Sequence, residues 1–275
     1  MTQRPPRFLI GVSHKMYFTH ASTREWCASV GEIARAHVAI TGTPAAVGAE
    51  LFVIPSFLSI CSALELLGDV ASVGAQDIAI EDFGAFTGEV SGAELVEVGC
   101  RVVLVGHAER RQLFGETEEI VAAKTSAALR NGLAPVVCIG EAEKGDPADA
   151  AAECIRQLES AIAPARARGQ AGRMIAAYEP YWAIGAAEPA SDDHIRTVCA
   201  TLREHLATWG DFPESAVIYG GSAGPGLLTR IADSVDGVFL GRFAHDPHSI
   251  SDILDEVSGL LDQTPAPASI RASEV

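Results

Sequence analysis

Positive charge is scarce in this 275-residue chain, and lysine is the scarcer of its two sources. Twenty Lys and Arg residues stand against 36 Asp and Glu residues, which leaves a formal net charge of −16. So acidic a chain repels phosphate-rich surfaces, which argues against a general binder of nucleic acids or of membranes. An anionic substrate would need a local positive site set against that field. The only lysines are Lys15, Lys124 and Lys144, which makes each of them noticeable.

Paired cysteine motifs and long apolar runs are also missing. The six cysteines include no Cys-x-x-Cys pair, so we expect free, buried thiols in a reducing compartment. No apolar run reaches the length of a transmembrane helix, and no apolar segment of a signal peptide follows the first residues. These features predict a cytoplasmic protein. The histidines show no spacing with acids or cysteines that is typical of a metal site, and we expect none.

What the chain does contain is a regular alternation of two kinds of segment. Short apolar, β-branched runs recur, and each is followed by a longer segment of helical spacing, which indicates a parallel sheet covered by helices. About eight such units in one chain of this length predict a closed, single-domain (β/α)8 barrel over residues 1–262. The Pro-, Ala- and Ser-rich end, 263–275, is expected to be a disordered tail. The expected strands are 8–13, 50–55, 70–76, 101–107, 134–140, 173–179, 215–221 and 236–241. The expected helices are 20–38, 57–67, 91–99, 117–131, 148–167, 191–209, 225–233 and 248–262.

Functional residue types gather where these strands end. The active site of such a barrel lies at the carboxyl ends of the strands, so residues far apart in the sequence meet there. Each of these residues alone is a weak indication, and their convergence on five strand ends carries the prediction. The residues are Lys15 after the first strand, His107 and Glu109 after the fourth, Glu179 after the sixth, Gly220, Gly221 and Ser222 after the seventh, and Gly241 after the eighth.

Glu179 ends an apolar strand and is followed by the segment PYWAIG, residues 180–185. A carboxylate in such surroundings should lose solvation, which raises its pKa toward that of a useful general base. The alternative is a carboxylate that only caps the next helix. The segment itself is too apolar for an ordinary surface loop, so we expect a lid that closes on a ligand and excludes water. A loop packed permanently in place is the alternative to a lid.

His107 and Lys15 suit the stabilisation of negative charge on a substrate. An imidazole at a helix N-terminus has a lowered pKa and stays neutral, so it can donate a hydrogen bond to a carbonyl oxygen. Lys15 could attract an anion and stabilise a developing oxyanion. A structural histidine and a surface lysine are the alternatives. The glycine-rich turns YGGS (219–222) and LGR (240–242) resemble the phosphate-binding turns of many barrels.

Several segments resemble triosephosphate isomerase along nearly the whole chain. They are VGHAERR, AYEPYWAIG, YGGS, GAFTGEVS and CIGE (138–141), with Lys15 after the first strand. The resemblance implies a TIM barrel that moves a proton between adjacent carbons without a cofactor. It implies Glu179 as the base, His107 as the neutral electrophile and Lys15 as the partner of the enediolate; a neutral histidine and a closing loop are known features of that family.

The resemblance also implies supporting roles for other positions. Backbone N–H groups of Gly185, Ser222 and Gly241 would bind the phosphate, with Ser13, Gly220, Gly221 and Arg242 around the substrate. Glu109 would pair with Lys15, and Cys138 would lie in the second layer of the site. The loop 77–89 is similar to the interdigitating loop of the family's homodimer, with Thr87 reaching the partner's site; a loop packed on its own subunit is the alternative.

Three positions depart from the family's usual pattern. Ser13-His14-Lys15 replaces Asn-Trp-Lys, which leaves more room near the substrate. Ala186-Ala187 replaces Thr-Gly at the end of the lid, and Arg242 replaces the second of two glycines, where a left-handed backbone would strain it. The departures spare the acid–base groups and alter the surroundings of the substrate.

The sequence therefore predicts an aldose–ketose isomerase of short sugar phosphates. Dihydroxyacetone phosphate and glyceraldehyde 3-phosphate are the default substrates, and a four-carbon ketose phosphate such as L-erythrulose 1-phosphate is the alternative. A sugar-phosphate sensor without turnover and another phosphate-binding barrel enzyme, such as an aldolase or epimerase, also stay open.

Overall fold

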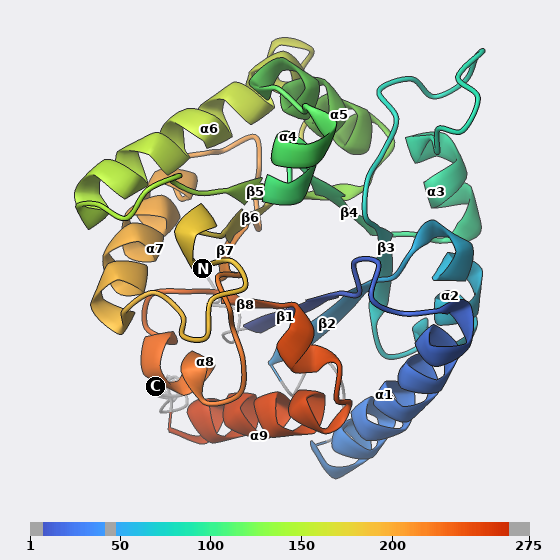
Figure 1. Ribbon diagram of the computed structural model, residues 1–275, viewed down its shortest axis with the longest axis vertical. Coiled ribbons are helices and arrows are strands. Elements are labelled where there is room, and N and C mark those ends of the chain that lie inside the picture. The colour runs from blue at the N-terminus through green and yellow to red at the C-terminus, as the bar shows by residue number, and fades with distance from the viewer. Residues whose placement is uncertain (1–7, 42–47, 264–275) are drawn as a thin grey trace, which may run out of the picture.

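Eight parallel strands close into a barrel in the computed structural model, which describes residues 8–41 and 48–263. The strands follow one another around the barrel in chain order, and β1 pairs with β8 to close it (Figure 1). The predicted single-domain (β/α)8 fold is therefore confirmed. The strands are β1 (Phe8–Ser13), β2 (Ala49–Ile54), β3 (Ser72–Ala75), β4 (Val102–Val105), β5 (Ala134–Ile139), β6 (Ile175–Tyr178), β7 (Ala216–Tyr219) and β8 (Gly237–Leu240).

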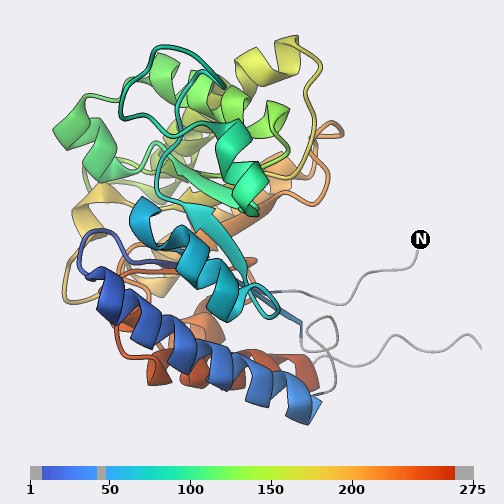
Figure 2. The same cartoon turned by 90° about the vertical axis from the view of Figure 1, so that its right-hand side faces the viewer.

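Helices surround the barrel, and Figure 2 shows α1 and α2 lying along the outside of the strands. The α-helices are α1 (His20–Thr41), α2 (Ile60–Leu67), α3 (Gly92–Val98), α4 (Ala108–Phe114), α5 (Glu118–Arg130), α6 (Pro147–Ala167), α7 (Asp192–Leu206), α8 (Leu227–Ile231) and α9 (His248–Asp262). Three short 3₁₀ helices are η1 (Phe57–Ser59), η2 (Tyr181–Ala183) and η3 (Arg242–Ala244).

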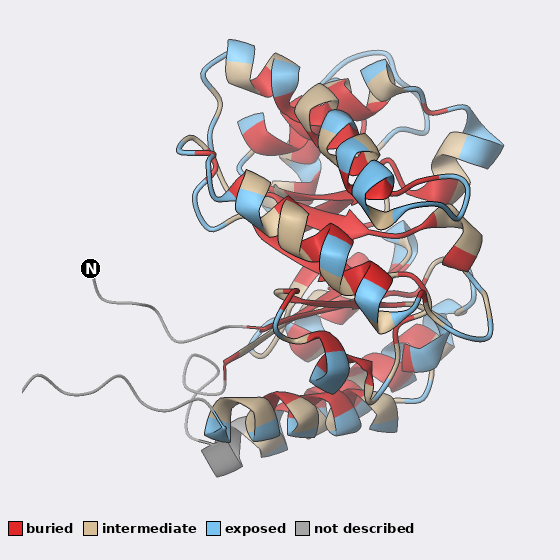
Figure 3. Cartoon of the chain, turned by 90° about the vertical axis from the view of Figure 1, so that its left-hand side faces the viewer, coloured by how far each residue is buried: buried red, intermediate tan, exposed pale blue. Residues whose placement is uncertain are grey.

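The core has two parts, one on each face of the closed sheet. Leu9 of β1 points into the barrel, where its neighbours include Phe52 and Phe239, whereas Ile10 packs against the surrounding helices. Because both faces are covered, the strands are buried on both sides, as Figure 3 shows by their colour. This double burial is the reason that the strands read as continuous apolar runs in the sequence.

Seven of the eight strands end one or two residues earlier than the sequence predicts, because the residues that follow them already form the turns that line the site, whereas β1 ends at Ser13 as predicted. The fourth strand, predicted as 101–107, ends at Val105, since His107 is already the N-cap of α4. The predicted helix 57–67 divides into η1 and α2, and the predicted helix 225–233 is reduced to α8. The barrel ends with α9 at Asp262. Apart from Gln263, the predicted tail lies outside the described residues.

All six cysteines are free thiols, as predicted, and five of them are buried. The prediction of burial is wrong for Cys61, which lies exposed on α2. In the part of the chain that the structure describes, no helix is both long and apolar enough to cross a membrane. The cytoplasmic location stays a prediction.

Candidate active site

A cavity of about 290 Å³ opens at the carboxyl ends of the strands. It brings together ten of the thirteen residues that the sequence predicts for the site, from five different strand ends and the lid. Those ten are Ser13, Lys15, His107, Glu109, Glu179, Gly185, Gly220, Ser222, Gly241 and Arg242. The structure therefore brings these ten residues to one cavity, and their roles stay predictions.

Glu179 follows β6 and is only 4% exposed. Its backbone N–H donates to the Ile139 carbonyl at 2.8 Å, which continues the pairing of β6 with β5. Glycine is required on both sides: a Cβ on Gly220 would lie 2.7 Å from Oε1 of Glu179, and one on Gly140 would collide with the Glu179 carbonyl oxygen. Burial raises the pKa of Glu179 to about 8, although the charge of Lys15 opposes this shift. Once ionised, such a carboxylate is a strong proton acceptor.

His107 is held as a hydrogen-bond donor beside this carboxylate. Its Nδ1 accepts a hydrogen bond from the backbone N–H of Glu109 at 3.2 Å, because His107 caps α4. Burial, and then the charge of Lys15, lower the pKa of His107 to about 4, so the ring is neutral. Since Nδ1 accepts, the proton of the neutral ring is on Nε2, which lies 3.4 Å from Oε2 of Glu179.

Lys15 occupies a strained backbone position at the mouth of the cavity. Its φ is +47°, in the left-handed region, and its Nζ lies 2.7 Å from Oε1 of Glu109. The side chain of Gln76 donates to the Lys15 carbonyl at 2.8 Å, and Oγ of Ser13 accepts from the Lys15 N–H at 3.3 Å. Sequence reasoning missed Gln76, although its position at the end of the predicted third strand was the available signal.

The lid lies folded over the cavity. Oγ of Ser222 donates to the carbonyls of Ala183 and Ala186 at 2.9 and 3.0 Å, and the Ala190 N–H donates to the hydroxyl of Tyr219 at 3.0 Å. Ser222 reaches the lid from a left-handed backbone, with a φ of +59°. These bonds join the lid and the segment that follows it to the last residue of β7 and to the turn after β7. The opening and closing of the lid stay a prediction.

The other end of the lid rests on Glu141, which is 8% exposed. Its carboxylate accepts hydrogen bonds from Nε1 of Trp182 at 2.8 Å and from the hydroxyl of Tyr178 at 3.1 and 3.2 Å. Nε2 of His194 lies 2.9 Å from the same hydroxyl. Of the two aromatic residues of the predicted lid, Trp182 is therefore accounted for by its hydrogen bond to this buried carboxylate. Glu141 is the last residue of the CIGE segment (138–141), but the sequence did not predict that its carboxylate would bond to Trp182 and Tyr178.

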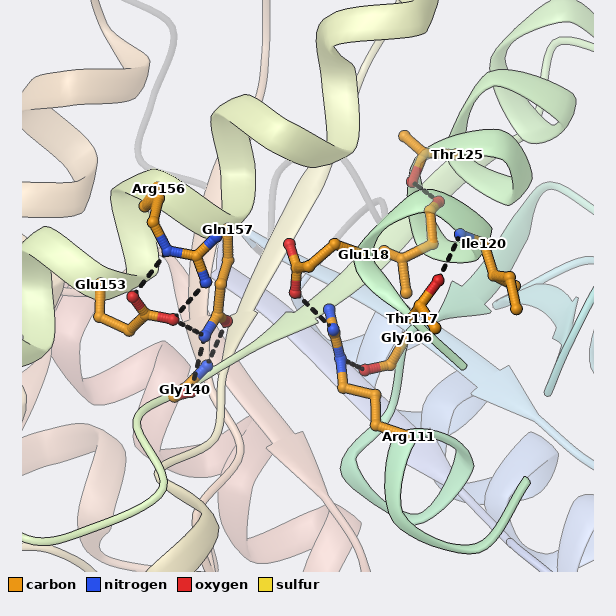
Figure 4. Close-up of polar contacts among 11 residues, drawn as sticks. Gly106, Arg111, Thr117, Glu118, Ile120, Thr125, Gly140, Glu153, Arg156 and Gln157 are labelled. Carbon is orange, nitrogen blue, oxygen red and sulfur yellow. Dashed lines mark hydrogen bonds and ion pairs between the residues drawn. The ribbon is translucent and has the colours of Figure 1, made fainter. Parts of the chain in front are cut away.

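Two polar contacts behind the site fix the backbone next to the catalytic candidates (Figure 4). Arg111 donates to the carbonyl of Gly106, the residue before His107, at 2.8 Å, and it pairs with Glu118 at 2.6 Å. The amide of Gln157 on α6 donates to the Gly140 carbonyl and accepts from the Gly140 N–H, each at 3.0 Å. Gly140 in turn borders Glu179.

Three predicted residues lie outside the cavity lining. Gly221 packs against Tyr219, where a Cβ would lie 2.5 Å from the hydroxyl oxygen. Cys138 lies in the barrel interior beneath Glu179, and burial raises the pKa of its thiol. Thr87 is exposed on the loop between β3 and α3, which projects beyond the ring of helices in Figure 1.

Arg242 lines the cavity, but the expected backbone strain is absent. The non-glycine residues with positive φ in the described chain are Lys15, Glu214 and Ser222, so Arg242 is not left-handed. It begins η3 instead, after Gly241 with a φ of −105°. The prediction of strain was wrong because the chain turns here through a 3₁₀ helix, which any L-residue can form.

Within the described residues, no group of three or more His, Cys, Asp or Glu side chains is arranged to hold a metal ion.

Comparison with known proteins decides the family. The family model described as triosephosphate isomerase matches residues 8–257. The chain belongs to the triosephosphate isomerase family. It is therefore a member of a family of isomerases, and the resemblance seen in the sequence is confirmed.

Proteins with two different names are similar in sequence to this chain. An L-erythrulose-1-phosphate isomerase from Pectobacterium atrosepticum is 48% identical over 258 residues, which cover 94% of this chain and 98% of the relative. A triosephosphate isomerase from Mycobacteroides abscessus is 42% identical over 206 residues, covering 72% of this chain and 78% of the relative. Another triosephosphate isomerase, from Synechococcus, is 32% identical over 261 residues, which cover 90% of this chain and 96% of the relative.

Proposed function

We propose that this protein isomerises a short ketose phosphate through an enediolate, with L-erythrulose 1-phosphate as its substrate. The observation that carries the reaction is the cavity in which buried Glu179, neutral His107 and Lys15 converge. The substrate is favoured by the 48% identity to an isomerase of that name over almost the full length of both chains.

Each of the three side chains has one task in this reaction. Ionised Glu179 removes a proton from the carbon next to the carbonyl and returns it to the neighbouring carbon. The Nε2–H of His107 donates to the oxygen on which negative charge develops, and the positive charge of Lys15 stabilises the same oxyanion. The proton of the substrate hydroxyl moves to the former carbonyl oxygen, so that the hydroxyl oxygen becomes the new carbonyl. Backbone N–H groups of Gly185, Ser222 and Gly241 would hold the phosphate.

The four-carbon substrate places one extra group beside the base. With phosphate and carbonyl aligned, L-erythrulose 1-phosphate differs from dihydroxyacetone phosphate by a hydroxymethyl group in place of one hydrogen on the carbon that loses its proton. The same proton transfer then gives a second ketose phosphate instead of an aldose. Ser13 lines the cavity with a short side chain, and this leaves room for the added group.

Triose phosphate is the second candidate substrate, because relatives named triosephosphate isomerase are 32–42% identical to this chain. The deciding experiment compares kcat/KM for L-erythrulose 1-phosphate and dihydroxyacetone phosphate on one preparation. We expect the four-carbon substrate to be preferred at least tenfold, which corresponds to about 1.4 kcal/mol in transition-state binding. A preference for the triose would contradict the proposed substrate and leave the reaction intact.

A second measurement tests turnover itself. Incubation of each phosphate with the protein in deuterated water should place deuterium on the carbon next to the carbonyl. No incorporation with either compound would contradict an isomerase and favour a sensor without turnover. Borohydride trapping of a Schiff base at Lys15 would favour an aldolase instead.

We also propose that two copies of the chain associate through the loop 77–89. Phe83 on this loop is 84% exposed. A hollow of about 410 Å³ next to the active site is lined by Met16, Leu113 and Phe114, which are themselves largely exposed. Apolar patches of this kind are typical of an interface between proteins. The loop of one copy would fill the hollow of the other, with Thr87 approaching its Lys15.

A further inference from the structure

We infer that the side chain of Arg242 binds the phosphate of the substrate and also holds the lid over the cavity through a hydrogen bond. The ligand class is a phosphate monoester, whose oxygens would accept hydrogen bonds from the guanidinium. This inference rests on the proposed function, because it requires a phosphorylated substrate. It adds a charged side chain to a site otherwise built from backbone N–H groups.

The position of Arg242 supports both parts of this role. It lines the same cavity as Gly185, Ser222 and Gly241, which surround the place proposed for the phosphate. Its Nη2 donates to the carbonyl of Gly185 at the tip of the lid, at 3.0 Å. Arg242 and Gly185 are 57 residues apart in the sequence, so this bond exists only when the lid lies over the turn after β8.

The charge of Arg242 is available to an incoming anion. Two cations line the cavity, and Lys15 is paired with Glu109 at 2.7 Å. Arg242 forms no ion pair with a carboxylate of residues 8–41 or 48–263. A guanidinium has five N–H donors, and the lid carbonyl uses one of them, so a bidentate contact with phosphate is still possible. In a chain with a net charge of −16, such a local cation offsets repulsion of the substrate.

The turn that carries Arg242 is anchored. In η3 the Ala244 N–H donates to the Gly241 carbonyl at 3.0 Å, and the His245 N–H donates to the Arg242 carbonyl at 3.1 Å. Nε1 of buried Trp26 donates to the Ala244 carbonyl at 2.8 Å. Because the backbone is fixed, binding of phosphate has to order little beyond the arginine side chain itself.

Two substitutions distinguish an Arg242 that binds phosphate from an Arg242 that only holds the lid in place through its bond to Gly185. Arg242→Gln keeps an amide donor for the Gly185 carbonyl and removes the charge, whereas Arg242→Lys keeps the charge. The control is Arg101→Gln, which removes the same charge from an exposed position at the amino end of β4. Binding of glycerol 3-phosphate, which has no carbonyl to react, is measured by titration calorimetry at fixed ionic strength.

We expect the Kd of glycerol 3-phosphate to rise about 10- to 100-fold in Arg242→Gln, the loss typical of a charged hydrogen bond. Arg242→Lys should recover part of the affinity, and Arg101→Gln should bind like the wild type. Equal affinity of the wild type and Arg242→Gln would overturn the inference, and so would equal losses in the Gln and Lys variants. Failure of the wild type to bind glycerol 3-phosphate would instead contradict the proposed function.

Discussion

At the scale of single residues, the site depends on burial that shifts two pKa values in opposite directions. Glu179 is held at a pKa of about 8 and His107 at about 4 by the same loss of solvation, because desolvation opposes charge of either sign. The carboxyl group becomes a stronger base and the imidazole becomes neutral. One buried environment therefore prepares both a proton acceptor and a hydrogen-bond donor.

The raised pKa of Glu179 predicts how kcat/KM depends on pH. Only ionised Glu179 can remove a proton, and its ionised fraction falls tenfold per pH unit below about 8. We therefore expect kcat/KM, which reports the ionisation of the ligand-free enzyme, to rise with pH up to about 8 and then to level off, with no further break from His107 above pH 5. Initial rates between pH 5.5 and 9.5 measure this profile. A flat profile would show that Glu179 is not the base in this state.

Glu179→Gln should lower kcat about 10²- to 10⁴-fold, the usual contribution of a positioned base. The same change should stabilise the fold at high pH. Because the folded pKa of Glu179 is raised, ionisation costs stability as pH rises from about 4.5 toward 8, and glutamine avoids this cost. Thermal unfolding at pH 5 and pH 9 tests this: the gain in Tm should be larger at pH 9. A variant with full turnover would contradict the mechanism.

Ser13 lines the same cavity as Glu179, which gives a prediction about substrate choice. Ser13→Asn would place a longer side chain at the cavity wall, where Ser13 is buried. We expect kcat/KM for L-erythrulose 1-phosphate to fall relative to that for dihydroxyacetone phosphate by about tenfold or more, on the order of 1–3 kcal/mol for a steric change of this size. An unchanged ratio of the two values would show that Ser13 does not select the substrate.

His14 is a buried histidine that the proposed reaction does not use. Neither ring nitrogen has a hydrogen-bond partner, and the ring stacks on Phe18 and contacts the edge of Trp26, each at 4.4 Å between centroids. Burial, followed by the charge of His245, lowers the pKa of His14 to about 4. The folded state therefore loses stability as pH falls from about 6.5 toward 4, where the unfolded chain takes up the proton first.

His14→Phe should stabilise the protein by about 1–3 kcal/mol, because it removes two buried polar atoms without partners and keeps the ring. The variant should also lose part of its sensitivity to acid between pH 6.5 and 4. Urea unfolding at pH 7 and pH 5 measures both effects, with the exposed His248→Phe as the control. A destabilised His14→Phe would mean that a polar contact of this ring matters.

At the scale of elements, helices α4 and α6 hold the backbone and side chains at the site through hydrogen bonds. Helix α6 holds Gly140 through Gln157, and Gly140 leaves space for the backbone of Glu179. Helix α4 begins at Ala108 with His107 as its N-cap, and its second residue, Glu109, orients the imidazole through a backbone N–H. The carboxyl ends of the strands thus supply the candidate reactive groups, and groups from the middle of α6 and from the first turn of α4 hold the backbone and the ring beside them.

Gln157→Leu tests this support from α6. The substitution leaves the buried N–H and carbonyl of Gly140 without partners, which should cost about 2–5 kcal/mol of stability. It should also reduce kcat, because Glu179 would lose its fixed neighbour. Chemical unfolding and initial rates are compared with Arg156→Leu, a control at an exposed position of the same helix. Equal stability of the two variants would contradict the role of Gln157.

At the scale of the whole molecule, two exposed apolar surfaces bear on association. Phe83 is exposed on the loop between β3 and α3, a loop that projects on the right in Figure 1, and Leu113 and Phe114 line the hollow close to the active site. A monomer would leave these surfaces in water at a cost of about 25 cal/mol per Å². Association through this side would also place a second copy next to the catalytic groups.

Phe83→Glu should convert a dimer into monomers of 28.8 kDa, because it places a charge in the proposed apolar contact. Since Phe83 is 84% exposed in the single chain, the change should not unfold the monomer. Light scattering after size-exclusion chromatography measures the mass. Ala207→Glu, at an exposed position after α7, adds the same charge elsewhere and should leave the mass unchanged. A monomeric wild type would contradict the proposed dimer.

The sequence by itself determined the barrel and the strand ends at which its candidate reactive groups lie. Strands buried on both faces must read as apolar runs, and the carboxyl ends of parallel strands must share one edge, so Lys15, His107 and Glu179 could be placed together. Only the tertiary structure decided what surrounds them. The backbone of Arg242, the support of Lys15 by Gln76 and the charge of Glu179 depend on distances between segments far apart in the chain. The residue pattern within a single strand or helix does not specify those distances.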